Sequence, residues 1–255
     1  MRLDDLCDGD LLLRARGLAV CDSLAGESIG TQSEKNLHRT LKYLFEPDSA
    51  YHEKEFLGSV CDILNGEGIT EIQTRSFEKL MPKLEKFLPL SQVTVVYPIV
   101  ERKSILYIDV ENGESIPLRK SSKRGSVTSA LPEIAKIRKY IPHENLRILL
   151  IFLDATETRM LNGKRKVGRQ KTSKIDLMPT AINSVIELRN VEDFAVLLPQ
   201  KLDDEFLSSD FEKASHLHAI ELHNSLMLLL HLGIVTRDKK GGRSYVYSIR
   251  KNNER

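Results

Sequence analysis

The chain has 255 residues, of which 41% are hydrophobic and 29% are charged, and this composition excludes an intrinsically disordered protein. The net charge is only +2, but the stretch from Pro117 to Lys174 contains fifteen basic and four acidic residues. This local excess of eleven positive charges suits a polyanionic partner such as nucleic acid. A solvated basic face with no such partner would have the same composition.

Cysteine usage and the N-terminal residues predict where the protein resides. The three cysteines, Cys7, Cys21 and Cys61, are an odd number and lack metal-ligand spacing. Four of the first ten residues are aspartates, which the start of a secretory signal would not carry. The longest apolar runs, at 148–153 and 226–230, are far shorter than the roughly 20 residues of a membrane span. We therefore expect a cytoplasmic protein with no membrane partner.

The first hundred residues predict a helix, a β-meander and a second helix. Residues 1–28 form an N-terminal extension in which we find no candidate chemistry. Leu37, Leu41 and Leu44 then follow helical spacing until Pro47. Three short strands are expected at 52–57, 59–64 and 69–74, followed by a helix at 76–88 and a buried strand at 93–100.

The middle of the chain predicts further strands with helices between them. We expect a hairpin at 104–110 and 115–118, a helix at 131–139, a buried strand at 146–153, a basic loop or long hairpin at 162–174, a short helix at 179–187 and a short strand at 194–198. This order predicts an α/β domain over residues 29–200, in which a mixed central sheet is flanked by helices.

Residues 201–255 predict a separate small domain. Two helices, at 208–214 and 219–232, enclose a short turn, and Gly233 ends the second helix. Two strands at 234–237 and 245–249 then surround a basic turn. This arrangement is typical of a winged helix-turn-helix module, although a helical hairpin capped by a β-hairpin would look the same without binding nucleic acid.

The candidate chemistry lies on the second and third predicted strands. Glu71 and Gln73 are two residues apart, so both side chains leave the same face of a strand. A turn of only a few residues separates this strand from the one that carries Asp62, and antiparallel pairing would bring Asp62 close to Glu71. Two carboxylates beside an amide form a hard-oxygen site that suits Mg²⁺, and such a metal would activate water near a phosphoryl group.

Asp62, a spacer of eight residues and then Glu71-Ile72-Gln73 together resemble the motif of the PD-(D/E)XK nuclease superfamily. The usual motif is Asp, a spacer, and then Glu or Asp, any residue and Lys. The resemblance covers roughly residues 29–155 and implies a restriction-endonuclease-like fold that cleaves phosphodiester bonds with Mg²⁺ or Mn²⁺. By position, Asp62 and Glu71 would be the metal ligands, Gln73 would occupy the lysine position, and Glu34 would match an acidic residue on the preceding helix.

Gln73 departs from the motif because an amide can hydrogen-bond a water but carries no charge. Lys79 and Lys83 on the following helix could supply the missing cation, with Lys83 the stronger candidate, or both could be plain surface lysines. Glu34, His38 and Lys42 recur every four residues, so they share a helical face that either lines the site or faces solvent. On the first strand, we expect Glu53 rather than His52 to face the site.

Basic residues in two segments of the α/β domain and in the predicted wing are the candidate phosphate contacts. They would supply affinity without reading sequence, because counterion release does not depend on the bases. Glu221, His223 and Asn224, at the start of the second tail helix, would then do any sequence reading. The predicted contacts are Lys120, Lys123, Arg124, Lys164, Arg165, Lys166, Arg169, Lys171, Lys239, Lys240 and Arg243.

These observations predict a metal-dependent endonuclease that hydrolyses DNA. The catalytic group would be Asp62, Glu71 and Gln73, with Glu34, Glu53 and Lys83 in support. Double-strand cutting usually needs two active sites, so a homodimer fits this prediction without being required by it. The alternatives are a catalytically inactive DNA-binding protein or regulator on a nuclease fold, and a partner-binding component of a larger complex.

Overall fold

The computed structural model describes residues 2–25, 32–109, 115–161, 172–239 and 245–250, with the backbone alone at positions 25, 32–35, 117 and 239. Within these ranges the chain forms two compact units, each built from three separate segments. The first unit comprises Met1–Thr74, Thr94–Gly125 and Leu149–Ile186, and the second comprises Arg75–Val93, Ser126–Ile148 and Glu187–Arg255.

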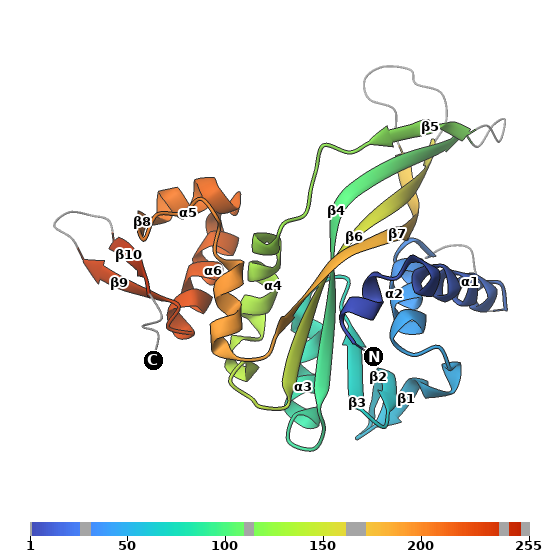
Figure 1. The fold of residues 1–255 in the computed structure, drawn as a ribbon, viewed down its shortest axis with the longest axis horizontal. Coiled ribbons are helices and arrows are strands. Elements are labelled where there is room, and N and C mark those ends of the chain that lie inside the picture. The colour runs from blue at the N-terminus through green and yellow to red at the C-terminus, as the bar shows by residue number, and fades with distance from the viewer. Residues whose placement is uncertain (1, 26–31, 110–114, 162–171, 240–244, 251–255) are drawn as a thin grey trace. The chain divides into compact units, whose positions relative to one another are not determined.

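The main sheet confirms the predicted mixed α/β architecture. In the described part of the chain it has seven strands in the order β1-β2-β3-β4-β6-β7, and β5 pairs with β4. The β1–β2 and β2–β3 pairs are antiparallel, whereas β4 and β6 run in the same direction and β7 returns beside β6 (Figure 1). The strands are β1 His52–Phe56, β2 Ser59–Asn65, β3 Gly68–Ile72, β4 Val93–Asp109, β5 Ser115–Lys120, β6 Leu146–Leu161 and β7 Thr172–Leu188.

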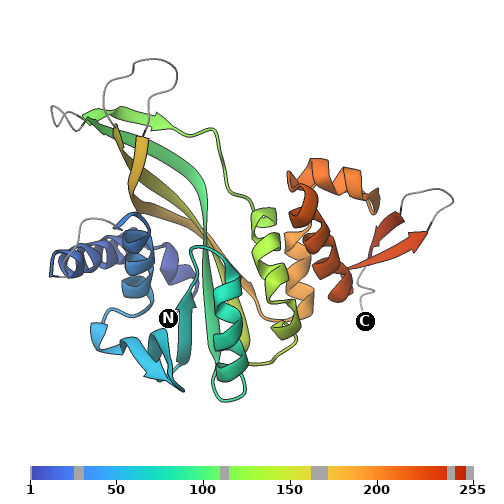
Figure 2. The same cartoon turned by 180° about the vertical axis from the view of Figure 1, so that it is seen from behind.

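Two helices of the first unit, α1 (Gly9–Ala25) and α2 (Gln32–Phe45), lie beside each other and against the sheet (Figure 1, Figure 2). Leu41 and Leu44 of α2 are buried together with Ile63, Ile72 and other apolar side chains from β2, β3, β4, β6 and β7. The helical spacing of the leucines therefore predicts the buried face of α2 correctly. Short 3₁₀ turns, η1 (Asp4–Cys7) and η3 (Ser49–Tyr51), precede α1 and β1.

The turn between β2 and β3 has the expected chemistry. The Asn65 side chain accepts a hydrogen bond of 3.0 Å from the backbone N–H of Glu67. Gly68 adopts a positive φ of 114°, which a residue with a Cβ rarely reaches. The turn sets the antiparallel register from Asn65↔Gly68 to Ile63↔Thr70, and this register positions Asp62 relative to Glu71.

The second unit combines short helices with a three-stranded sheet of order β8-β10-β9. Helix α6 packs against α4, which lies more than eighty residues earlier in the chain. The helical elements are η4 Phe77–Leu80, α3 Met81–Phe87, η5 Val127–Ala130, α4 Leu131–Lys136, η6 Arg138–Tyr140, η7 Val191–Leu197, α5 Ser208–Ser215 and α6 Ala219–His231. The strands are β8 Glu205–Leu207, β9 Val235–Lys239 and β10 Tyr245–Ile249.

The C-terminal helices and strands lie close to their predicted positions. His216 closes α5 in the left-handed conformation with φ 58°, and Gly233, with φ 67°, follows the end of α6. The N–H of Gly233 donates to the carbonyl of Leu230, which satisfies one of the last helical carbonyls. β8 was not predicted, because a strand of three residues is too short to show a period.

The structure corrects the sequence prediction at three places. Residues 179–187, expected to be helical, continue β7, and we attribute this to pairing with β6, which outweighs the local helical preference. Residues 194–198 were expected to be a strand, but 191–197 form η7, because the Asp193 carboxylate accepts the backbone N–H groups of Arg189 and Asn190. The strands predicted at 93–100 and 104–110 are one continuous strand, β4.

Candidate functional site

Three carboxylates, those of Glu53, Asp62 and Glu71, lie on the neighbouring strands β1, β2 and β3. The pairs His52↔Ile63 and Lys54↔Cys61 flank Glu53 and Asp62 on neighbouring strands. On the other side of β2, the last pair with β3 is Ile63↔Thr70. Asp62 and Glu71 are the next residues beyond this pair on the two strands. Extending both registers by one step would pair Asp62 with Glu53 on one side and with Glu71 on the other, and we call these three residues the rung.

Asp62 occupies the point where the backbone pairing of β2 and β3 stops. The last residue pair between β2 and β3 in this direction is Ile63↔Thr70. The backbone N–H of Ile72, two residues after Thr70, donates instead to Asp62 Oδ2 at 2.7 Å. A side-chain carboxylate therefore takes a hydrogen bond that a backbone carbonyl would accept in a regular ladder. The same oxygen lies 3.1 Å from His38 Nε2 on α2, so donors from a strand and a helix hold the carboxylate in place.

The polar face of α2 points inward at His38 and Lys42. Lys42 lies one turn after His38, is only 8% exposed, and forms an ion pair with the Glu53 carboxylate. Glu53 adopts a positive φ of 50°, which is uncommon for a residue other than glycine. The alternative that this helical face is solvent-exposed is therefore wrong for His38 and Lys42, which bind two of the three carboxylates.

Glu71 and Gln73 differ in their exposure. Glu71 is completely buried at 0% exposure, and an ionised carboxylate is costly to bury unless donors or cations surround it. Gln73 directly follows β3 and is half-buried, and its backbone N–H donates to the carbonyl of Val96 at 2.9 Å. Ile72, between them, is buried in the apolar core.

His52 is not part of this rung. Its Nε2 lies 2.8 Å from the backbone carbonyl oxygen of Glu46, and its ring packs edge-on against Tyr43. Burial lowers the pKa of His52, which favours the neutral ring. On β1 it is therefore Glu53, and not His52, that binds Lys42 of α2.

The other predicted site residues lie in several places. Glu34 belongs to α2, but its side chain lies outside the described residues. Lys83 lies half-buried on α3 in the second unit, and Lys79 is exposed on η4. Lys120, Lys123 and Arg124 are exposed in the first unit. The remaining predicted phosphate contacts fall outside the described residues: Lys164, Arg165, Lys166, Arg169, Lys171, Lys240, Arg243 and the side chain of Lys239.

The donor set of the rung suits a hard divalent cation. Among the described side chains, no group of three His, Cys, Asp or Glu residues is arranged to hold a metal ion. Mg²⁺ does not require such a cage, because it usually keeps several waters and takes one or two carboxylates together with substrate phosphates. Asp62 and Glu71 carry carboxylates and therefore match that ligand type. The Glu71 carboxylate is already buried, so water has no access to it before a metal binds.

A second group of polar side chains, on β4, β6 and β7, was not predicted. Arg102 binds Asp154 through two contacts, and Asn183 donates to both Asp154 and Glu101. Burial raises the pKa of Asp154, but the hydrogen bonds from Arg102 and Asn183 outweigh it, and the pKa lies below its usual range. The only sequence signal was the charged pair Glu101-Arg102 after an apolar run, which by itself indicates nothing more than the end of a buried segment.

Residues 35–189, more than half of the chain, match the family described as "Domain of unknown function (DUF8091)". The chain belongs to this family. The matched segment contains the whole rung with His38 and Lys42, and it ends before β8.

A curated protein from Treponema pallidum (strain Nichols), titled "Uncharacterized protein", is 31% identical over 221 residues. The match covers 86% of this chain and 87% of the Treponema protein. It therefore extends well beyond the segment that defines the family. No solved structure matches the chain. In the described part of the chain, no helix is both long and apolar enough to cross a membrane.

Proposed function

We propose that this protein hydrolyses phosphodiester bonds in DNA with a divalent metal held by Asp62 and Glu71. The observation that carries the proposal is the gap in the β2–β3 ladder, where Ile72 and His38 orient the Asp62 carboxylate and the buried Glu71 directly precedes Ile72 on the neighbouring strand. A carboxylate pair built into a sheet and braced by a helix provides the rigid support that a metal site requires.

Residues near the metal ligands would orient the ligands and the attacking water. Mg²⁺ or Mn²⁺, when bound, would activate a water and neutralise charge on the phosphoryl group. His38 holds one oxygen of Asp62, so it orients this ligand. Gln73 lies two residues beyond Glu71, and its amide can orient the attacking water by hydrogen bonding.

Lys42 is our candidate for the positive charge that Gln73 does not provide. Its ammonium group lies against Glu53, on the same rung as Asp62 and Glu71, and its stem is almost fully buried. A cation with little access to water acts more strongly on neighbouring negative charge than an exposed one.

The C-terminal elements support DNA as the substrate. The order β8-α5-α6-β9-β10, with a sheet in which β10 lies between β8 and β9, is compatible with a winged helix-turn-helix module. In such a module, α6 would enter the major groove and the residues between β9 and β10 would contact the backbone.

Cleavage assays with plasmid, linear, nicked and single-stranded DNA test the proposal in Mg²⁺ and in Mn²⁺. We expect Asp62→Ala and Glu71→Gln to reduce cutting by about 100-fold or more, because each removes a ligand. Glu55→Gln is the matched control, since Glu55 is an exposed carboxylate on β1 outside the rung. Cutting that survives both variants, with folding verified by circular dichroism, would refute the assigned site.

A DNA-binding protein without cleavage is the second candidate, and the neutral Gln73 favours it. This candidate predicts DNA binding that weakens steeply with salt while no metal or substrate supports cutting. Replacing Gln73 with Lys distinguishes the two. If the Gln73→Lys variant cuts DNA faster than the unaltered protein, the missing positive charge limits catalysis. Cutting by the unaltered protein would exclude the second candidate.

A further inference from the structure

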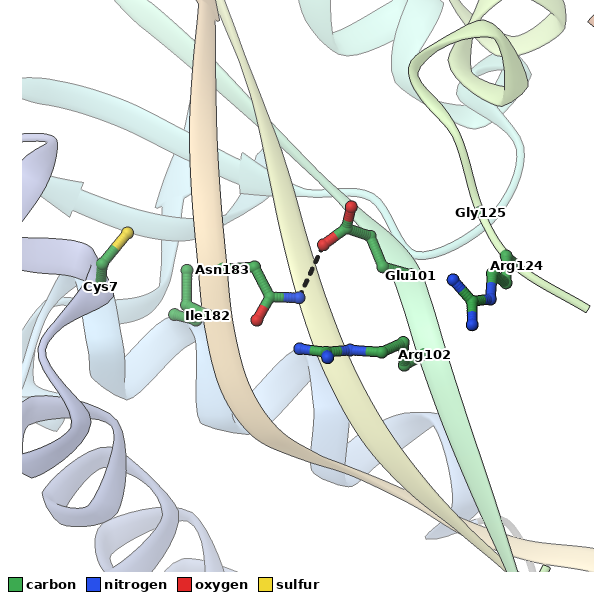
Figure 3. A pocket seen from close by; sticks show the side chains of 7 residues that line it. All are labelled: Cys7, Glu101, Arg102, Arg124, Gly125, Ile182 and Asn183. Atoms are coloured by element: carbon green, nitrogen blue, oxygen red, sulfur yellow. Dashed lines mark hydrogen bonds between the residues drawn. The ribbon is translucent and has the colours of Figure 1, made fainter. Parts of the chain in front are cut away.

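A polar pocket of about 660 Å³ lies in the first unit, away from the rung (Figure 3). Its volume falls in the range of roughly 300–1,000 Å³ that is typical of small-molecule sites. Three elements supply its polar side chains: β4, the segment after β5, and β7. The lining residues are Cys7, Glu101, Arg102, Arg124, Gly125, Ile182 and Asn183.

The wall formed by β4, β6 and β7 is held rigid by a hydrogen-bonded network. Arg102 binds Asp154 in a bidentate manner, with Nε–Oδ1 at 3.0 Å and Nη2–Oδ2 at 2.8 Å. Asn183 Nδ2 donates to Asp154 Oδ1 at 2.9 Å and to Glu101 Oε2 at 2.6 Å, and the second of these bonds is drawn in Figure 3. Both protons of the Asn183 amide are used, so its Oδ1 is an acceptor. Surface ion pairs add little stability, and we infer that the network serves to orient these groups.

Arg124 is brought to the pocket by a close approach of the backbone. Gly125 donates its N–H to the carbonyl of Val100 at 2.9 Å. A Cβ at Gly125 would lie 2.7 Å from both Ile99 Cγ2 and Val100 O, a separation that real Cβ atoms do not show. The segment is therefore held against β4, and Arg124 lies on the other side of Glu101 from Asn183 (Figure 3).

The charges of the pocket leave one guanidinium uncompensated. Arg102 is paired with Asp154, whereas Arg124 makes no hydrogen bond or ion pair with the described part of the chain. The lining thus combines the Arg124 guanidinium with two acceptors, the Glu101 carboxylate and the Asn183 carbonyl. Guanidinium groups bind phosphate through paired hydrogen bonds, and a carboxylate accepts hydrogen bonds from the amino groups of bases.

We propose that this pocket binds a nucleotide, with the phosphate on Arg124 and the exposed edge of Arg102, and with donors of the base or sugar on Glu101 and Asn183. Both ligands that fit this description carry a phosphate next to the hydrogen-bond donors of a base or sugar. The ligand is either a free mononucleotide or the terminal nucleotide of a strand. The site is independent of the hydrolysis proposed at Asp62 and Glu71.

Titration calorimetry of the full chain in EDTA tests this proposal, because no metal-dependent cleavage can occur. The probes are the common mononucleotides, a 5′-phosphorylated trinucleotide, the corresponding nucleosides and inorganic phosphate. We expect a mononucleotide or the trinucleotide to bind, and Arg124→Ala to weaken this binding by about tenfold or more. Tighter binding of the mononucleotide would identify a free ligand, and binding of the trinucleotide alone would identify a strand end.

Two further variants and the binding of inorganic phosphate test whether the site is specific. Lys54→Ala, which removes an exposed charge on β1, should change the affinity less than twofold, and a loss equal to that of Arg124→Ala would show diffuse electrostatics instead of a site. Asp62→Ala should bind the nucleotide normally, which separates this site from the proposed catalytic one. Inorganic phosphate binding as tightly as every nucleotide, or no binding of any probe, would refute a nucleotide site.

Discussion

Single residues in this protein have roles that depend on what stands next to them in space. Gly125 and Gly17 are both glycines, but the space around Gly125 is crowded and the space around Gly17 is open. A Cβ at Gly125 would meet β4 at 2.7 Å, whereas one at Gly17, within α1, would meet no atom within 4 Å. Asp62 is likewise oriented by its neighbours, because the Ile72 N–H and His38 Nε2 both lie within hydrogen-bonding distance of one of its carboxylate oxygens.

Alanine at these two glycines should change stability in opposite directions. We expect Gly125→Ala to lower the free energy of unfolding by about 1–3 kcal/mol, because the backbone must move away from β4. Gly17→Ala should raise it by roughly 0.5–1 kcal/mol, because alanine restricts the unfolded chain and favours the helix. Urea unfolding followed by circular dichroism measures both. Equal effects of the two variants would contradict the close approach at Gly125.

Individual elements are joined by polar contacts as well as by apolar packing. Glu157 of β6 is only 3% exposed, and its carboxylate binds Lys103 of β4 at 2.7 Å and also Arg159 on its own strand. Burial raises the pKa of Glu157, but the hydrogen bonds and charges of Lys103 and Arg159 outweigh it and leave the pKa below its usual value of 4.5. The carboxylate is therefore charged at neutral pH and links two neighbouring strands.

The contribution of Glu157 to stability should depend on pH. Because folding lowers its pKa, the contribution is fully present above about pH 4.5 and is lost as the pH falls through the folded-state value. Glu157→Gln should cost about 1–3 kcal/mol at pH 7, since Lys103 and Arg159 keep partial access to water. The difference from the unaltered protein should shrink in acid. Thermal unfolding between pH 3 and 7 measures it, with Glu55→Gln as the control, and a pH-independent difference would argue against a charged Glu157.

At the scale of the whole molecule, the chain alternates between its two units. Each unit takes three segments. Three of the five boundaries fall within continuous strands, between residues 93 and 94 of β4, 148 and 149 of β6, and 186 and 187 of β7. In the second unit, α6 packs on α4, so the C-terminal helices depend on a segment from the middle of the chain. Leu131 and Ile134 of α4 are both completely buried.

A fragment of residues 201–255 should therefore fold poorly when expressed alone. It retains α5, α6 and the β8-β10-β9 sheet but lacks the α4 side chains against which α6 packs. Domains this small have little apolar surface to spare, so loss of one packing partner removes a large share of the stability. We expect weak helical circular dichroism and no cooperative thermal transition. A sharp transition in the fragment would show that α4 is dispensable.

Much of the molecule follows from local sequence, for a physical reason. The spacing of Leu37, Leu41 and Leu44 predicts the buried face of α2, and Asn65–Gly68 predicts the turn that aligns Asp62 with Glu71. The C-terminal helices are also predictable, because Gly233 and the leucine spacing of α6 act within a few residues of one another. The family match confirms only that the segment 35–189 forms a recurrent domain.

Contacts between distant segments decided the rest. Pairing with β6 makes residues 179–187 a strand, and packing on the sheet turns His38 and Lys42 inward toward the carboxylates. Arg102, Asp154 and Asn183 are 52 and 29 positions apart in sequence and meet only because β4, β6 and β7 are neighbours. Such groups leave no periodic signal, because hydrogen bonds and ion pairs act over a few ångströms of space and are indifferent to the length of chain between them.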